Sequence, residues 1–123
     1  MKPINPLKKV LAKLEDLDKL NALLRASAAH WGYDDAFLDK YMEIFTVTEK
    51  LFNKSVIFLV YLQDALLGCY SFIDHEDDLE LDMFFISPNY IGKGFGRALW
   101  SLCCQTMQEL GHHSFYLIAD PNA

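Results

Sequence analysis

Three glycines fall within five residues, at Gly92, Gly94 and Gly96, between a segment with the pattern of a strand and one with the pattern of a helix. Glycine takes up positive φ at little cost and lets a ligand approach the backbone closely. The first N–H groups of the following helix lack partners and carry partial positive charge. The loop therefore predicts a nest for a pyrophosphate, and a glycine-rich turn needed only for tight strand–helix packing stays open as the alternative.

The distribution of charge also points to this loop. The chain of 123 residues has a formal net charge of −6, which makes nucleic acid an unexpected main partner. Residues 56–123 contain only two basic side chains, Lys93 and Arg97, and both lie in or beside the glycine loop. Six acidic residues lie between positions 74 and 82. They form either a solvated hairpin loop or an acidic wall that attracts a cationic substrate.

The first part of the chain predicts two helices. Apolar residues recur at three- and four-residue steps over residues 7–29, which is typical of a helix with one buried stripe. Asp34 or Asp35 can cap a second helix. That helix is expected to bury five side chains: Phe37, Leu38, Tyr41, Met42 and Phe45.

The second part predicts strands around one more helix. Residues 56–62 and 66–73 have the pattern of a hairpin, and residues 79–86 have that of a third strand. The alternation of apolar and acidic residues in the third strand stops near residues 83–85, which either a bulge or a doubly buried strand end would explain. A helix that ends at Gly111 and a last strand at 114–119 follow. Because a helix connects the strands at 79–86 and 114–119, these two strands are expected to pair in parallel. The expected fold class is α+β, a mixed and mostly antiparallel sheet with flanking helices in one domain, residues 1–123.

Two common phosphate-binding motifs do not fit the loop. The P-loop pattern G-x-x-x-x-G-K-S/T is absent, and Arg97 takes the place of the third glycine of the dinucleotide fingerprint. A third pattern does fit. Pro88, Tyr90 and then Gly94-x-Gly96 at the start of a helix resemble the acyl-coenzyme A loop of the GNAT N-acetyltransferase superfamily. Residues 81–88 and 119–123 also resemble segments of that superfamily, and the predicted elements follow its order.

The resemblance implies direct transfer of an acetyl group from acetyl-CoA, a co-substrate, to a primary amine, with no metal. A base must take a proton from the amine before attack, and Glu80 is assigned that role, directly or through water, with Asp82 attracting a cationic small-molecule or peptide amine. For both carboxylates the alternative is a solvated position on the strand. A backbone N–H near Phe85 would polarise the thioester carbonyl. The residues expected at the cofactor are Phe84, Phe85, Ile86, Ile91, Gly92, Lys93, Gly94, Phe95, Gly96, Arg97 and Asn122.

Two departures from the family's pattern shape the expectations. Ile91 stands where the superfamily usually has Arg or Gln, so one polar contact to the pyrophosphate is lost. The usual C-terminal helix and last two strands are expected to be missing after Ala123, which would leave an exposed sheet edge able to pair with a second copy as a homodimer. A non-catalytic CoA-binding or dimerisation module is therefore the alternative function.

The cysteines and the N-terminus suggest a cytoplasmic protein. Cys69, Cys103 and Cys104 are odd in number and form no disulfide framework, and Cys103 falls on a helix stripe as a buried structural thiol. No secretory signal is found, and the longest apolar run, residues 56–62, is too short to span a membrane. The histidines and cysteines lack the spacing of zinc ligands, so no metal site is expected.

Overall fold

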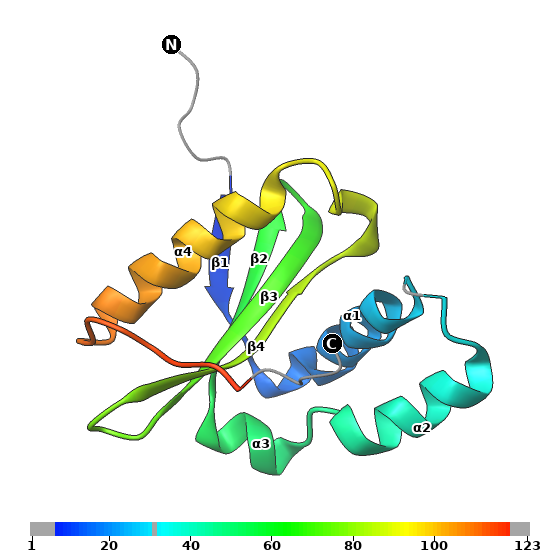
Figure 1. The fold of residues 1–123 in the computed structure, drawn as a ribbon, viewed down its shortest axis with the longest axis horizontal. Coiled ribbons are helices and arrows are strands. Elements are labelled where there is room, and N and C mark those ends of the chain that lie inside the picture. Colours follow the sequence, from blue (N-terminus) through cyan, green and yellow to red (C-terminus); the bar gives the residue numbers. More distant parts are fainter. Residues whose placement is uncertain (1–6, 31, 119–123) are drawn as a thin grey trace.

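The computed structural model describes residues 7–30 and 32–118. A four-stranded antiparallel sheet in the order β1-β2-β3-β4 forms its centre. Helix α4 (Phe95–Glu109) covers one face, and helices α1 (Leu17–Ala29), α2 (Asp35–Phe45) and α3 (Glu49–Lys54) lie on the other side (Figure 1). This arrangement confirms the α+β class with flanking helices. The strands are β1 (Leu7–Leu11), β2 (Val56–Leu62), β3 (Ala65–Asp74) and β4 (Leu79–Ile86).

The prediction that residues 7–29 form one helix is wrong at its start. Residues 7–11 form β1, which pairs antiparallel with β2 from Leu7 opposite Leu62 to Leu11 opposite Phe58. Pairing with β2 satisfies the backbone of this segment, and such tertiary contacts override local helix periodicity. After a short 3-10 turn, η1 (Leu14–Asp16), the helix begins at Leu17 and ends at Ala29.

Helix α2 forms where Asp34 predicts it, with the backbone N–H of Phe37 donating to Asp34 Oδ1 at 2.8 Å. The prediction that it buries five apolar side chains is wrong. Only Leu38 is buried, whereas Tyr41 and Met42 are half-buried and Phe37 and Phe45 are exposed. The helix lies beside α1 at the edge of the molecule (Figure 1), and Phe37 and Phe45 remain 46% and 53% exposed. Helix α3, capped by the Thr48 hydroxyl, was not predicted.

Hydrophobic side chains pack on both faces of the sheet. The layer under α4 consists of Val60, Leu67, Tyr70, Phe72, Leu79, Leu81, Leu99, Leu102, Cys103 and Met107. The layer under α1 consists of Ala12, Leu20, Leu23, Leu24, Val47, Ile57, Leu59, Cys69 and Met83. Cys103 is therefore a buried core thiol, as predicted. Among the described residues, no helix combines the length and apolar character that crossing a membrane requires.

A β-bulge interrupts β4. Ser71 lies opposite Met83 and Phe72 opposite Leu81, so Asp82 is the extra residue. Before the bulge Leu79 and Leu81 face α4, whereas Met83 after it faces α1. The lost alternation thus comes from a bulge, one residue before the predicted range. Its consequence is that Asp82 and Met83 lie on the same side of the sheet, toward α1.

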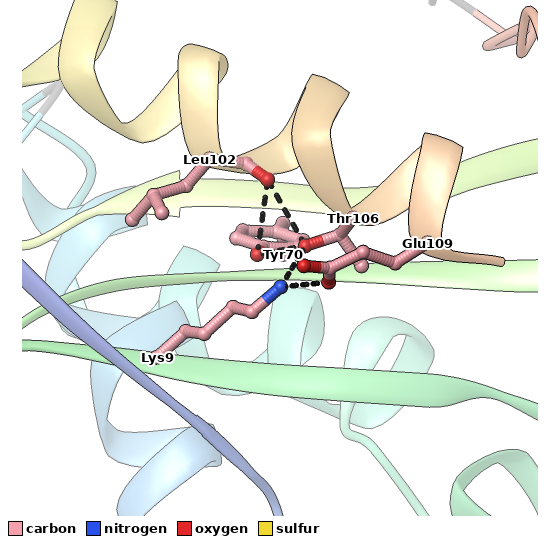
Figure 2. A network of polar contacts seen from close by, with 5 residues as sticks. All are labelled: Lys9, Tyr70, Leu102, Thr106 and Glu109. Carbon is pink, nitrogen blue, oxygen red and sulfur yellow. Dashed lines mark hydrogen bonds and ion pairs between the residues drawn. The ribbon is translucent and has the colours of Figure 1, made fainter.

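A polar network fixes α4 to the sheet (Figure 2). The Tyr70 hydroxyl lies 2.6 Å from Thr106 Oγ1, and Lys9 Nζ donates to the same oxygen at 2.9 Å and also to Glu109. The Thr106 hydroxyl itself donates to the Leu102 carbonyl at 3.0 Å. Burial raises the pKa of Tyr70 to about 12, so its hydroxyl stays protonated. The network links β1, β3 and α4.

The chain beyond α4 returns to β4. Gly111 (φ 87°) follows the helix, His112 N donates to Met107 O at 3.1 Å and Gly111 N to Gln108 O at 2.9 Å, which is a Schellman ending and confirms Gly111 as the helix stop. The last strand predicted at 114–119 is reduced, within the described residues, to one parallel bridge between Tyr116 and Glu80. The parallel direction is as predicted.

Candidate active site

Two residues of the glycine loop adopt the left-handed backbone conformation. Gly92 and Gly94 have φ of 81° and 86°, and a Cβ at either would meet no atom within 4 Å. Conformation, not crowding, therefore favours glycine at these two positions. Of the three glycines in this loop, only Gly96 is closely packed, since its Cβ would lie 3.2 Å from Ile86 Cδ1. Tight packing alone thus does not account for the loop.

The start of α4 also leaves backbone amides without a partner. Gly94 is the N-cap of α4, so the amides of the first helical residues have no partner within the helix. None of the turn, loop and cap hydrogen bonds among the described residues is donated by an amide of residues 92–97. Lys93 and Arg97 are exposed, and neither forms an ion pair with a described residue. The helix terminus and two cations are thus available to an anion.

A hollow lies beside this loop at the end of β4. It measures about 350 Å³ and is lined by Ser27, Phe84, Phe85, Ile86 and Ile91. The lining is almost wholly apolar, with Ile91 where the family's pattern has a polar residue. This hollow suits an apolar or amide-bearing chain that extends from a pyrophosphate at the loop.

The backbone of β4 presents alternate residues to its open edge. Ser87 N donates to Leu67 O at 2.7 Å, so these two residues form a hydrogen-bonded pair. Two positions along the ladder, Cys69 and Phe85 form the next pair of this kind. Because bonded and non-bonded pairs alternate in an antiparallel ladder, the Phe85 N–H points toward β3. The N–H groups of Phe84 and Ile86 point away from β3, to the open edge.

A side chain of α1 supports the outward direction of the Ile86 backbone groups. The Ser27 hydroxyl donates to the carbonyl of Ile86 at 3.1 Å, so that carbonyl faces outward, toward α1. An oxyanion donor was expected near Phe85. The ladder places Phe84 and Ile86, not Phe85, where an edge amide can meet a carbonyl oxygen.

A second cavity, of about 320 Å³, lies between α2 and β4 and contains Asp82. A smaller hollow of about 190 Å³ shares Tyr41 and Phe85 with this cavity and Ser27 and Phe85 with the hollow beside the loop. Phe85 therefore lines all three spaces. The three spaces lie along β4, from Ile91 before the glycine loop to Asp82. The Asp82 cavity is lined by Leu24, Tyr41, Ile44, Phe45, Thr46, Leu51, Asp82, Met83 and Phe85.

Asp82 and Glu80 share the face toward α1 but have different surroundings. Burial raises the pKa of Asp82, the Glu80 carboxylate raises it further, and Lys54 opposes the shift. Glu80 does not line the cavity, and its Oε1 lies 3.0 Å from His75 Nε2. The Tyr116 ring stacks on His75, and burial together with Glu80 raises the Tyr116 pKa. Glu80 thus sits in a small polar cluster next to the cavity.

The remaining acidic residues gather elsewhere. Asp74, Glu76, Asp77 and Asp78 line a separate hollow of about 520 Å³ between the β3–β4 loop and the end of α4, together with His112 and His113. His112 Nε2 lies 3.0 Å from Asp74 Oδ1. The acidic residues between positions 74 and 82 therefore do not form one wall. Of these six residues, only Asp82 lines the cavity between α2 and β4. Asn122 lies outside the described residues.

Sequence reasoning missed the α2 wall of the cavity. Tyr41, Ile44 and Phe45 line it, although the sequence pattern assigned Tyr41 and Phe45 to the core. Their four-residue spacing behind the Asp34 cap predicts a shared helix face, and the rings of Tyr41 and Phe45 do pair at 4.6 Å. Nothing in the spacing tells whether that face meets the core or a cavity.

Comparison with known proteins places these features in a family. The model of the acetyltransferase (GNAT) family matches residues 19–123. A comparison with curated protein sequences gave no match. A PaiA N-acetyltransferase from Thermoplasma acidophilum, solved in complex with coenzyme A, has a TM-score of 0.76 at 18% identity. The match covers 94% of this chain and 80% of that chain.

Two further solved structures share the fold. The ribosomal-protein-S18-alanine N-acetyltransferase from Escherichia coli has a TM-score of 0.65 at 15% identity, with 95% of this chain and 70% of that chain covered. An aminoglycoside acetyltransferase from an uncultured soil metagenomic sample, in complex with sisomicin, has a TM-score of 0.58 at 17% identity, with 94% and 79% covered. At these identities the structures establish the fold.

Proposed function

The chain belongs to the acetyltransferase (GNAT) family, and from that premise we propose that it transfers an acetyl group from acetyl-CoA to a primary amine. The observation that carries the proposal is the alignment of an anion-accepting helix start and several hollows along one strand. Amides of the first turn of α4, which have no partner within the helix, lie at one end, and three hollows that share Phe85 as a lining residue lie along β4 as far as Asp82. A related fold was solved with coenzyme A bound, which supports the choice of co-substrate.

The glycine loop would hold the pyrophosphate of acetyl-CoA. Its unpartnered amides and the positive end of α4 favour an anion there, and Lys93 and Arg97 add charge. The apolar hollow at Phe84, Ile86 and Ile91 would take the arm that carries the thioester. The outward amides of Phe84 and Ile86 are the proposed donors to its carbonyl oxygen.

Acetyl-CoA supplies a thioester: the amine nitrogen bonds to its carbonyl carbon, the carbon–sulfur bond breaks, and the sulfur leaves as a thiolate that takes up a proton. This chain's residues must bind the amine and remove its proton. We assign Asp82 to hold the ammonium group, because it is the carboxylate within the cavity. Glu80 keeps the predicted role of base, acting through water, with the His75 ring beside it as an exit for the proton.

Acetyl-CoA binding is tested first. Acetyl-CoA at about 100 times its dissociation constant should add about 2.7 kcal/mol to the free energy of unfolding. The double variant Lys93→Ala, Arg97→Ala should weaken binding at least tenfold by calorimetry, whereas Lys50→Ala, at an exposed site on α3, should not. A protein whose melting temperature does not respond to acetyl-CoA would rule out the co-substrate site.

Catalysis is tested by release of the free thiol of CoA with a panel of amines. Glu80→Gln should lower kcat about 100-fold or more with little change in KM, the size expected for a general base. Asp82→Asn should act mainly on the KM of the amine. If Glu80→Gln releases CoA as fast as the wild type, Glu80 is not the base. Tight acetyl-CoA binding with no release for any amine would favour the non-catalytic module instead.

Two further expectations belong to this proposal. We place the protein in the cytoplasm, since its cysteines form no disulfide framework. We also propose that two copies pair through the segment 114–118, where Leu117 and Ile118 are exposed. Light scattering should give twice the chain mass, and Ile118→Asp should give monomers. A monomeric wild type at micromolar concentration would exclude the dimer.

A further inference from the structure

The Asp82 cavity is walled by apolar and aromatic side chains. Apart from Asp82 and Thr46, each residue that lines it has an aliphatic, thioether or aromatic side chain. Asp82 is its single charged lining residue among those described. A cavity of this kind recognises a ligand by apolar contact and orients it by one charged group.

Aromatic rings form the side of the cavity that α2 contributes. The rings of Tyr41 and Phe45 lie 4.6 Å apart, and Phe85 of β4 faces the same space. At the mouth Ile44 is 74% and Phe45 53% exposed, although both are large and apolar. Exposed apolar side chains around a cavity mark a surface where a ligand or partner binds. An apolar ligand body would cover them.

The charge in the cavity matches one ammonium group. The charged groups around Asp82 are Glu80, from its own strand, and Lys54, from the end of α3. Asp74, Glu76, Asp77 and Asp78 line the separate hollow at the β3–β4 loop, so they do not reach this cavity. Glu80 is not in the lining and pairs with His75, so a second ammonium group inside the cavity would meet apolar side chains without a partner of its own, which is costly.

We propose that the acceptor is a small primary amine with one positive charge and an aromatic or apolar body, an arylalkylamine by chemical class. This inference rests on the proposed acetyl transfer and specifies its substrate. The ammonium group lies against the Asp82 carboxylate, and the ring packs on Tyr41, Phe45 and Phe85. Polyamines, which carry several separated charges, and aminoglycosides, which carry several charges on a polar body, are disfavoured by the same lining.

Binding is measured by calorimetry on the full chain saturated with CoA, with probes that differ in one feature each. 2-Phenylethylamine should bind at least tenfold more tightly than ethanolamine, which lacks the ring, and than spermidine, which lacks the ring and adds charges. Asp82→Asn should weaken 2-phenylethylamine about tenfold and leave 2-phenylethanol unchanged, because only the amine carries the charge. Phe45→Ala should weaken both aryl ligands.

The control variants lie outside the cavity. Asp77→Asn removes an exposed acid in the other hollow, and Leu11→Ala removes an exposed apolar side chain on β1, so neither should alter binding of any probe. Tighter binding of spermidine than of 2-phenylethylamine would overturn the inference, as would equal binding of 2-phenylethylamine to wild type and Asp82→Asn.

Failure of this inference and failure of the proposed function give different results. If 2-phenylethylamine binds as described but no CoA is released, the assigned ligand class stands and acetyl transfer is overturned. If CoA is released with spermidine and not with 2-phenylethylamine, acetyl transfer stands and the assigned class is wrong. Release with 2-phenylethylamine that Phe45→Ala slows through KM supports both.

Discussion

A Cβ placed at Gly68 would lie 2.3 Å from the carbonyl oxygen of Phe85, on the neighbouring strand. It would also lie 3.1 Å from Leu99 Cδ2 on α4. Glycine at position 68 therefore lets β3 lie close to the part of β4 that lines the cavities. The position of Phe85 depends on the absence of one methyl group on β3.

Gly68→Ala should destabilise the protein by about 1–3 kcal/mol, because backbone must move to admit the methyl group. Gly96→Ala is the matched control, since its Cβ would meet only the end of the flexible Ile86 side chain, and alanine favours a helix. Urea unfolding compares the two variants. A Gly68→Ala protein as stable as Gly96→Ala would contradict the close contact.

In the network of Figure 2, Thr106→Val should cost more stability than Tyr70→Phe. Tyr70→Phe leaves Thr106 Oγ1 bonded to Lys9 and Leu102, so about 1 kcal/mol is expected. Thr106→Val leaves the buried Tyr70 hydroxyl with only the Leu102 carbonyl, at 3.4 Å, and about 1–3 kcal/mol is expected. Urea unfolding at neutral pH measures both, and the reverse order would show that Thr106 is not the centre of the network.

Asp82→Asn should raise the melting temperature near neutral pH. Burial, and then Glu80, raise the pKa of Asp82 in the folded state. The unfolded chain then loses this proton at lower pH, so the carboxyl destabilises the fold as pH rises from the unfolded pKa through the folded pKa. The gain of the variant over the wild type should disappear below both pKa values. A gain that is equal at acidic and neutral pH would contradict this origin.

Asp74→Asn should have the opposite effect. The Glu76 amide and then the His112 ring lower the pKa of Asp74 in the folded state. Its contribution to stability is therefore present above the unfolded pKa and is lost as pH falls through the folded pKa. Thermal unfolding across the acid range should show the variant less stable than the wild type near neutral pH and equal at the acid end. An unchanged melting temperature near neutral pH would mean that the pairing of Asp74 adds nothing to stability.

The three cysteines should differ in reactivity toward a thiol reagent. Burial raises the pKa of Cys69 and of Cys103 to about 12, whereas the Cys104 side chain is only half-buried. In mildly alkaline buffer one thiol per chain should react quickly and two only as the protein unfolds. Cys104→Ser should abolish the fast reaction. Three equal rates in the native protein would show that the core thiols are accessible.

Local signals in the sequence predicted much of the fold. The hairpin of β2 and β3, the cap at Asp34, the stop at Gly111 and the glycine loop depend on conformational preferences of single residues and their near neighbours. Such preferences can be identified from the sequence before any packing is known. The two basic residues at the loop, Lys93 and Arg97, can likewise be identified from the sequence alone.

The sequence by itself determined the class of fold, the three strands between residues 56 and 86 and the glycine loop at the start of α4. Only the tertiary structure decided that residues 7–11 form a strand on β2, that a bulge puts Asp82 within a cavity while Glu80 pairs with His75, and that the aromatic face of α2 is a cavity wall. These outcomes depend on which surfaces pack together across long sequence separations, and a local pattern contains no information about that choice.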